Sequence, residues 1–277
     1  MWVSPSSATW WRVLSDLSES IVVSVVFAFT LLALAMAAER CLPAARAPRR
    51  PLQWFNLRYT LAMLLLVCAT KPLQVSVPMI ITHALGTGWI RFGTGRSGWI
   101  VAFIVVLVFT DLLEYLFHRA QHSVSFLWKM HELHHSAEHY DVTLTYRNYW
   151  LEPVLKAMFM YPLVGILFSV PPGVATAVGI VFTINHHVAH LNVRFAPRFV
   201  ALLFSHPQYH RMHHSRHEPD YNVNFCDLLT VWDRVFGTYR PLRADEFVDV
   251  GLSSGDAPAT LLEAMLWPWR RRALALA

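Results

Sequence analysis

Long apolar runs alternate with short polar segments along the first two thirds of the chain. Residues 21–38 form a continuous apolar run, and residues 57–81, 99–117, 154–170 and 173–190 form four more. A helix needs about 20 apolar residues to cross the hydrocarbon core of a bilayer. The pattern therefore predicts an all-α protein, a bundle of about four to five transmembrane helices.

Proline and glycine mark where these predicted helices bend or end. The Lys-Pro pair at residues 71–72 predicts a kink or a break in the second run, because proline removes a helical hydrogen bond. Residues 86–98 are rich in glycine and predict a turn. The Pro-Pro-Gly sequence at residues 171–173 predicts a tight hairpin between the last two helices. Residues 204–277 contain no convincing span, and we expect them to form a cytoplasmic cap.

Composition and charge agree with a membrane protein. Hydrophobic residues make up 55% of the 277 residues and charged residues only 15%, which is too little charge to cover a soluble domain. The net charge is +5, and five arginines lie between Arg40 and Arg58. Positive residues concentrate in cytoplasmic loops of membrane proteins. We therefore expect an irregular cytoplasmic linker at residues 39–58, and the basic charge does not indicate a nucleic acid partner.

The distribution of histidine divides the chain into three regions. Of the 15 histidines, all but His83 lie between His118 and His217, and such clustering predicts a metal site. We expect a membrane region with a basic linker at residues 1–98, a histidine-rich domain at residues 99–240 and a cytoplasmic tail at residues 241–277. The three cysteines are far apart and predict neither a disulfide framework nor a cysteine metal site.

Four short motifs hold most of the histidines. They are HxxxH at residues 118–122, HxxHH at residues 131–135, a looser HxxxH at residues 186–190 and HxxHH at residues 210–214. Spacings of three and four place side chains on one helical face, whereas adjacent histidines diverge by about 100°. Two boxes of each kind on one membrane face can therefore surround a pair of metal ions.

Residue type leaves the metal open, because imidazole binds iron, zinc, copper and nickel alike. In the third motif His187 competes with His186, and we favour His186. Asp111 and Glu114 precede His118 by seven and four residues inside an apolar run, where ionisable groups need a partner. We expect both carboxylates to accept the outer N–H of ligand imidazoles and so to tune the metal ligands.

The order of these motifs resembles the fatty acid hydroxylase/sterol desaturase superfamily. The resemblance covers about residues 100–240 and rests on HRAQH, FLWKMHELHHS, NHHVAHLNVRF and a long final segment that begins HPQYHRMHHS and ends WDRVFGTY. It implies an integral membrane helical bundle under a cap with a histidine-ligated di-metal site, two iron ions in the working enzyme, and O₂ as oxidant. It also implies electrons from NAD(P)H through a separate carrier of the ferredoxin or cytochrome b5 type.

Applied to the matching positions, the resemblance also implies a ligand set. The ten implied metal ligands are His118, His122, His131, His134, His135, His186, His190, His210, His213 and His214. The chain departs from relatives in one element, often Arg-x-His-Pro-x-Glu, where Tyr149 and Trp150 stand between Arg147 and Glu152. The sequence contains no glycine fingerprint for a flavin or a nicotinamide, so we expect the electron carrier to be a partner.

The predicted function is the hydroxylation or desaturation of a lipid-like substrate in a membrane, with zinc as a further metal that a preparation could contain. The absence of an ER retention tail favours a bacterial inner membrane with the histidines on its cytoplasmic side. One alternative is a carotenoid hydroxylase of the same histidine-box type. Another is a membrane protein that binds or transports metal without redox chemistry, but transport predicts ionisable residues in the middle of several spans.

Overall fold

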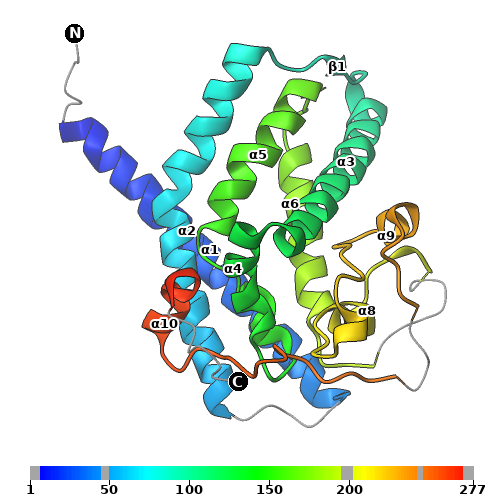
Figure 1. Ribbon diagram of the computed structural model, residues 1–277. Helices are drawn as coiled ribbons and strands as arrows, with labels where there is room; N and C mark the ends of the chain where they lie inside the picture. The colour runs from blue at the N-terminus through cyan, green and yellow to red at the C-terminus, as the bar shows by residue number, and fades with distance from the viewer. Residues whose placement is uncertain (1–6, 45–49, 195–201, 242–245, 271–277) are drawn as a thin grey trace.

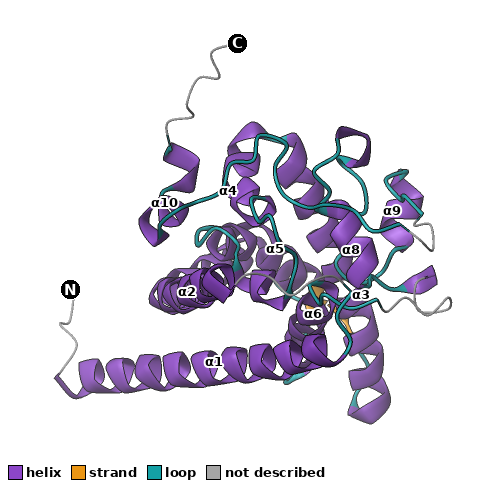
Figure 2. Cartoon of the chain, turned by 90° about the horizontal axis from the view of Figure 1, so that it is seen from below, coloured by secondary structure: helices purple, strands orange, loops and turns teal. Residues whose placement is uncertain are grey.

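Three long helices form the frame of the protein (Figure 1). The computed structural model describes residues 7–44, 50–194, 202–241 and 246–270, with the backbone alone for residues 7–20. The long helices are α1 (Ser7–Cys41), α2 (Arg50–Leu85) and α3 (Gly95–Ser123), and each contains a stretch long and apolar enough to cross a membrane. Figure 2, in which α2 is seen nearly end-on, shows α1 lying along one side of the bundle and crossing α2. The helical membrane fold predicted from the sequence is confirmed.

Two shorter helices form the hairpin that the Pro-Pro-Gly sequence predicts. Helix α5 (Glu152–Leu167) and helix α6 (Val174–Ala189) stand side by side between α2 and α3 (Figure 1). Each has 16 residues, which at 1.5 Å per residue gives about 24 Å, less than the roughly 30 Å of hydrocarbon in a bilayer. The described part of the bundle thus combines three full-length candidate spans with one shorter helical pair.

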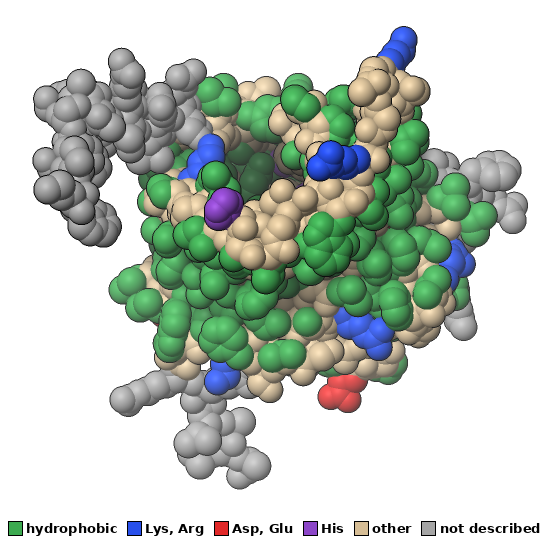
Figure 3. Space-filling view, turned by 90° about the horizontal axis from the view of Figure 1, so that it is seen from above, with side chains coloured by type: hydrophobic (Ala, Val, Ile, Leu, Met, Phe, Trp, Pro, Cys, Tyr) green, Lys and Arg blue, Asp and Glu red, His purple; other side chains and the backbone are tan. Residues whose placement is uncertain are grey.

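The end of the bundle remote from the histidines is closed by a short parallel sheet. Strand β1 (Ile90–Arg91) pairs with β2 (Phe168–Ser169), in the register Ile90 to Phe168. The glycine-rich turn supports this pairing, since a Cβ added at Gly88 would lie 2.9 Å from the Cβ of Ser169 in β2. Figure 3 shows that hydrophobic side chains dominate this end.

Helix α2 continues without a break through its prolines, contrary to one of the two outcomes expected at residues 71–72. Polar side chains add hydrogen bonds in the turn that precedes Pro72. The carbonyl of Val67 accepts hydrogen bonds from Thr70 Oγ1 at 3.0 Å and from Gln74 Nε2 at 3.0 Å. These bonds reinforce the turn before the proline, and such local adjustments help membrane helices to tolerate proline.

The expected irregular linker is much shorter than residues 39–58. Helix α1 extends to Cys41 and α2 begins at Arg50, with Pro51 in its first turn, where the missing N–H removes no helical bond. Two of the five arginines of this segment, Arg46 and Arg49, lie outside the described residues.

Short helices gather at the opposite end of the bundle and form a cap (Figures 1 and 2). They are α4 (Ser125–His135), η1 (Val142–Tyr146), α8 (Pro207–His213), η2 (Glu218–Asp220), α9 (Val231–Phe236), α10 (Leu261–Met265) and η3 (Trp267–Trp269). An apolar cluster joins this cap to the membrane helices. In it, Tyr59 and Met63 of α2 pack with Met130 and Leu133 of α4 and with Trp267.

Candidate metal centre

Nine histidines converge in two groups at the cap end of the bundle. Within each group the candidate ligand atoms all lie within 4.8 Å of one another. The first group consists of His118, His122, His131, His135 and His213. The second group consists of His134, His190, His210 and His214. The adjacent pairs of both HxxHH motifs are split between the groups, as the divergence of neighbouring residues on a helix requires.

Hydrogen bonds to backbone carbonyls fix the protonation of several of these rings. His118 Nδ1 lies 2.7 Å from the carbonyl oxygen of Phe225, and His213 Nδ1 lies 2.8 Å from that of Val223. His190 Nδ1 lies 2.8 Å from the carbonyl one turn earlier in its helix. A carbonyl only accepts, so each Nδ1 carries the hydrogen and each neutral ring presents an unprotonated Nε2. This arrangement is typical of metal-bound histidine.

The spacing of the Nε2 atoms fits a metal ion. In the second group, His190 Nε2 lies 3.3 Å from His134 Nε2 and 3.1 Å from His210 Nε2, and His214 Nε2 lies 3.3 Å from His210 Nε2. Nitrogens about 2.1 Å from one metal are separated by roughly 3.0–3.4 Å at octahedral to tetrahedral angles. The second group therefore already has the dimensions of a coordination shell.

The first group contains buried nitrogen atoms that need a partner. The Nε2 atoms of His122, His135 and His213 have no hydrogen-bond partner among the described residues. A buried polar atom without a partner costs about 1–3 kcal/mol, and a cation placed among these lone pairs removes that cost. Both groups thus fit a bound metal, so the geometry supports two metal sites.

Burial keeps the rings in the form that binds metal. Desolvation, followed by repulsion from neighbouring imidazoles, lowers the pKa of His134, His135, His210 and His214 well below the ordinary value of 6.5. These four rings are therefore neutral at pH 7, and metal can bind to them without displacing a proton.

Comparison with known proteins agrees with this centre. A family model described as fatty acid hydroxylase matches residues 103–238, which include all nine of these histidines. The chain is 33% identical over 135 residues to alkylglycerol monooxygenase of Xenopus tropicalis, covering 47% of this chain and 29% of that protein. The chain belongs to the fatty acid hydroxylase/sterol desaturase superfamily.

Other relatives within the superfamily carry related names. The chain is 31% identical over 177 residues to ornithine lipid hydroxylase OlsE of Rhizobium tropici, covering 63% of this chain and 53% of that protein. It is 25% identical over 158 residues to sphinganine C4-monooxygenase 1 of Arabidopsis thaliana, covering 55% of this chain and 59% of that protein. The chain spans between 29% and 59% of the length of these relatives. No solved structure shows a significant match.

Asp111 binds the loop before α9 and does not contact a histidine ring as the sequence predicted. Its buried carboxylate accepts hydrogen bonds from the backbone N–H groups of Leu228 and Leu229, both at 3.0 Å, and from Trp232 Nε1 at 2.9 Å. Glu114 also does not contact a histidine ring as expected. Its Oε2 instead accepts a hydrogen bond from Lys156 Nζ at 2.5 Å. Spacing along a helix placed both acids near the site but could not show which donors the folded chain brings to them.

The side chains of His186 and His187 lie outside both histidine groups. His186 Nε2 lies 3.0 Å from Asp227 Oδ2, while His187 donates through Nδ1 to the carbonyl of Thr183. Of the third motif, His190 alone joins a group. The ion pair with His186, together with the nearby ammonium group of Lys156, lowers the pKa of Asp227, so this carboxylate is ionised.

Three acids that sequence reasoning did not select support the centre. Glu152 Oε2 lies 3.6 Å from His131 Nδ1, Asp227 pairs with His186, and Asp233 accepts hydrogen bonds from the N–H groups of residues 225 and 226. Glu152 ends the Arg-x-His-Pro-x-Glu element and Asp233 lies in WDRVFGTY. Their place in these motifs was the available signal, whereas Asp227 lies in the long final segment at no spacing that singles it out.

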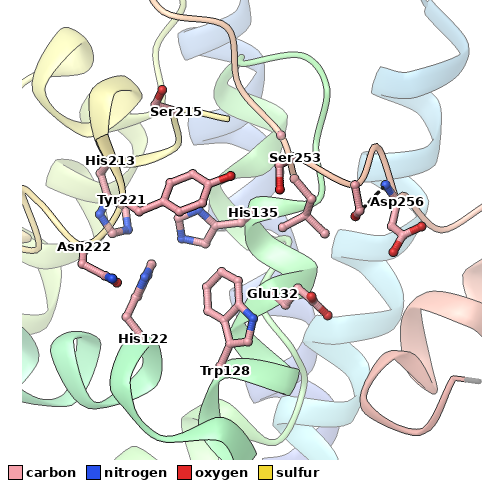
Figure 4. Close-up of a pocket in the computed structure, with 13 residues that line it drawn as sticks. His122, Trp128, Glu132, His135, His213, Ser215, Tyr221, Asn222, Ser253 and Asp256 are labelled. Carbon is pink, nitrogen blue, oxygen red and sulfur yellow. Dashed lines mark hydrogen bonds between the residues drawn. The ribbon is translucent and has the colours of Figure 1, made fainter. Parts of the chain in front are cut away.

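A cavity of about 650 Å³ opens beside the first group. His122, His135 and His213 form its inner wall, and Trp128 and Tyr221 flank it (Figure 4). Its outer rim contains residues 251–254 and Asp256 from the C-terminal part of the cap, and the figure labels Ser253 and Asp256 there. The cavity thus combines a histidine-lined inner wall and aromatic flanks with a largely polar rim.

A smaller cavity of about 50 Å³ touches both histidine groups. Its lining includes His131 of the first group and His134 of the second, together with Glu114, Lys156 and Asp227. This space therefore lies between the two candidate metal sites. The Glu114–Lys156 and His186–Asp227 ion pairs line it.

Proposed function

We propose that this protein is a membrane-bound di-iron oxygenase that hydroxylates a lipid with O₂ and electrons from an external carrier. The observation that carries the proposal is the pair of buried histidine groups beside the larger cavity. The names of the relatives, which are monooxygenases and hydroxylases of alkylglycerol, ornithine lipid and sphinganine, support hydroxylation over desaturation.

The nine converging histidines are proposed to hold two iron ions, one in each group. Bound iron would supply the activation of O₂. The protein's own contribution is to fix the rings through the carbonyls of Phe225, Val223 and His186, and to bury them away from water. We assign His186, the tenth implied ligand, to holding Asp227 beside the smaller cavity, and we assign Asp111 and Glu114 to positioning roles.

The larger cavity is the proposed site for the reacting part of the substrate. Trp128 and Leu252 offer apolar contacts, while Asn222, Ser253 and Ser254 offer hydrogen bonds. An amphiphilic lipid whose attacked carbon lies near a polar headgroup fits such a lining. A wholly apolar carotenoid would leave these polar groups without partners, which disfavours that alternative.

The histidine end is proposed to face the cytoplasm of a bacterial inner membrane. Arg40 in the last turn of α1 and Arg50 at the start of α2 lie at this end. Cytoplasmic orientation would also give a soluble electron carrier access to the cap.

The test is O₂-dependent conversion of lipid by the purified, iron-loaded protein. It should be incubated with membrane lipids, NADPH, a reductase and a ferredoxin, and the products analysed by mass spectrometry under ¹⁸O₂. We expect one labelled oxygen in a lipid product, lost in His135→Ala and His214→Ala but retained in His83→Ala, which changes a histidine outside both groups. Two bound metals per chain without O₂ consumption would instead support a non-redox metal protein. Conversion of a carotenoid alone would support that alternative.

A further inference from the structure

A stack of arginine and aromatic side chains runs from the protein surface to the second histidine group. The guanidinium carbons of Arg194 and Arg211 lie 5.0 Å and 3.8 Å from the centre of the Phe247 ring. Arg211 also lies 5.4 Å from the centre of the Tyr140 ring. The centre of that ring is 5.8 Å from His190, and the two rings are tilted by only 25°.

Hydrogen bonds hold the inner part of this stack in place. Tyr140 is 3% exposed, and its hydroxyl donates to the carbonyl of Ala189 at 2.7 Å, next to His190 in the chain. Arg211 Nε donates to the carbonyl of Val248 at 2.9 Å. The stack therefore has a fixed inner end at the candidate metal site, while Arg194 at its outer end is exposed.

The surface around the outer end is positively charged. We define the arginine surface as Arg194, Arg211, Arg216 and Phe247. The nearby acidic side chain on this surface is Asp249, whose backbone carbonyl accepts from the N–H of Arg216 at 3.0 Å. Among the described residues, the three arginines outnumber the exposed carboxylates close to them in the chain, Glu218 and Asp249, because Glu246 beside Phe247 pairs with Arg240. A guanidinium group stacked on a ring can still donate N–H bonds at its edge to carboxylates of a partner.

We propose that the arginine surface docks an acidic one-electron carrier protein, and that Tyr140 links this docking site to the second histidine group. The proposal rests on the proposed function. Hydroxylation breaks one C–H bond, consumes O₂, two electrons and two protons, and yields the alcohol and one water. Each carrier molecule gives up one electron and leaves oxidised, so two carriers must dock in each cycle. A charged, partly exposed surface suits such brief binding, because it raises the association rate more than the affinity.

The first test measures binding rather than turnover. Calorimetry of the iron-loaded protein in detergent with an acidic [2Fe–2S] ferredoxin should show binding that weakens as salt rises. Arg211→Glu and Arg194→Glu should each weaken it at least about tenfold, the effect expected for a reversed charge at the contact. Arg234→Glu is the matched control, because Arg234 also stacks on an aromatic ring, Tyr239, at 3.8 Å but lies on α9. Equal binding of all variants would overturn the proposal.

The second test follows the electron from ferredoxin into the protein by stopped-flow absorbance. Tyr140→Phe keeps the ring and should keep the rate, whereas Tyr140→Leu should slow it at least about tenfold. Reduction by dithionite, a small reductant that needs no docking surface, should be unchanged in both variants, provided that each retains its iron. An unchanged ferredoxin rate in Tyr140→Leu would refute the link through this ring.

Two outcomes separate this proposal from its alternatives. Loss of binding to phosphatidylglycerol vesicles in Arg211→Glu, with ferredoxin binding intact, would identify a lipid headgroup site and overturn the proposal. Salt-dependent ferredoxin binding and rapid reduction without any lipid product would support the docking surface while contradicting the proposed hydroxylation.

Discussion

Asp233 offers a sharp test of how the loop before α9 supports the metal centre. Its carboxylate is fully buried, and Oδ1 accepts from the N–H of Phe225 at 2.9 Å and from Thr238 Oγ1 at 2.5 Å. Oδ2 accepts from the N–H of Cys226 at 2.9 Å and from the hydroxyl of Tyr209. In Asp233→Asn one oxygen becomes an NH₂ group, so whichever way the amide turns, two of the four hydrogen bonds are lost.

The expected cost follows from these bonds. A hydrogen bond to a charged group contributes about 1.5–3 kcal/mol, so two lost bonds correspond to roughly 3–6 kcal/mol, reduced somewhat because a neutral amide is easier to bury. A loss of about 3 kcal/mol lowers the unfolding temperature by roughly 6–12 °C in a domain of 150–250 residues. Movement of Phe225 also removes the carbonyl that orients His118, and loss of such a partner weakens metal binding about 10–100-fold.

The assay is thermal unfolding of the detergent-purified protein by tryptophan fluorescence, with iron content measured on the same sample. Tyr209→Phe removes one bond to Asp233 and should have a smaller effect. Glu138→Gln changes an exposed carboxylate and should leave both readouts unchanged. If Asp233→Asn unfolds within about 2 °C of the parent protein and keeps its full iron content, the reasoning is refuted.

Three further predictions concern the bundle and the metals. Gly98→Ala should lower the unfolding temperature, because the added Cβ would meet the carbonyl of Gly93. Gly179→Ala is the control and should leave the unfolding temperature unchanged, because no atom lies within 4 Å of its added Cβ. The metal-free protein should lose stability as pH falls below 6.5, because His134 and His214 take up protons there only in the unfolded state. The free energy of unfolding should fall by about 1.4 kcal/mol per pH unit for each ring. A stability that rises toward pH 5.5 in urea titrations would contradict the sign of these shifts. Removal of metal by a chelator should lower the unfolding temperature, and added Fe²⁺ should restore it; equal unfolding temperatures would argue against metal at this centre.

The sequence alone determined the helical membrane class and the superfamily, because both follow from local pattern. Apolar run length sets which segments can cross a bilayer, and spacings of three and four place histidines on one helical face. The same local reasoning overestimated the length of the linker before α2. It placed Pro51 within the irregular linker, although proline is compatible with the first turn of a helix.

Only the tertiary structure decided which histidines share a group and what supports them. The rings of His134 and His135 are adjacent in sequence but belong to different groups, because neighbouring residues on a helix point in different directions. His186 has the helical spacing of a ligand, but the fold brings Asp227 to its ring from 41 residues away. Asp111 likewise meets its donors across more than 100 residues. Periodicity reports the face of a helix on which a side chain lies, whereas the partner it meets depends on how distant segments pack.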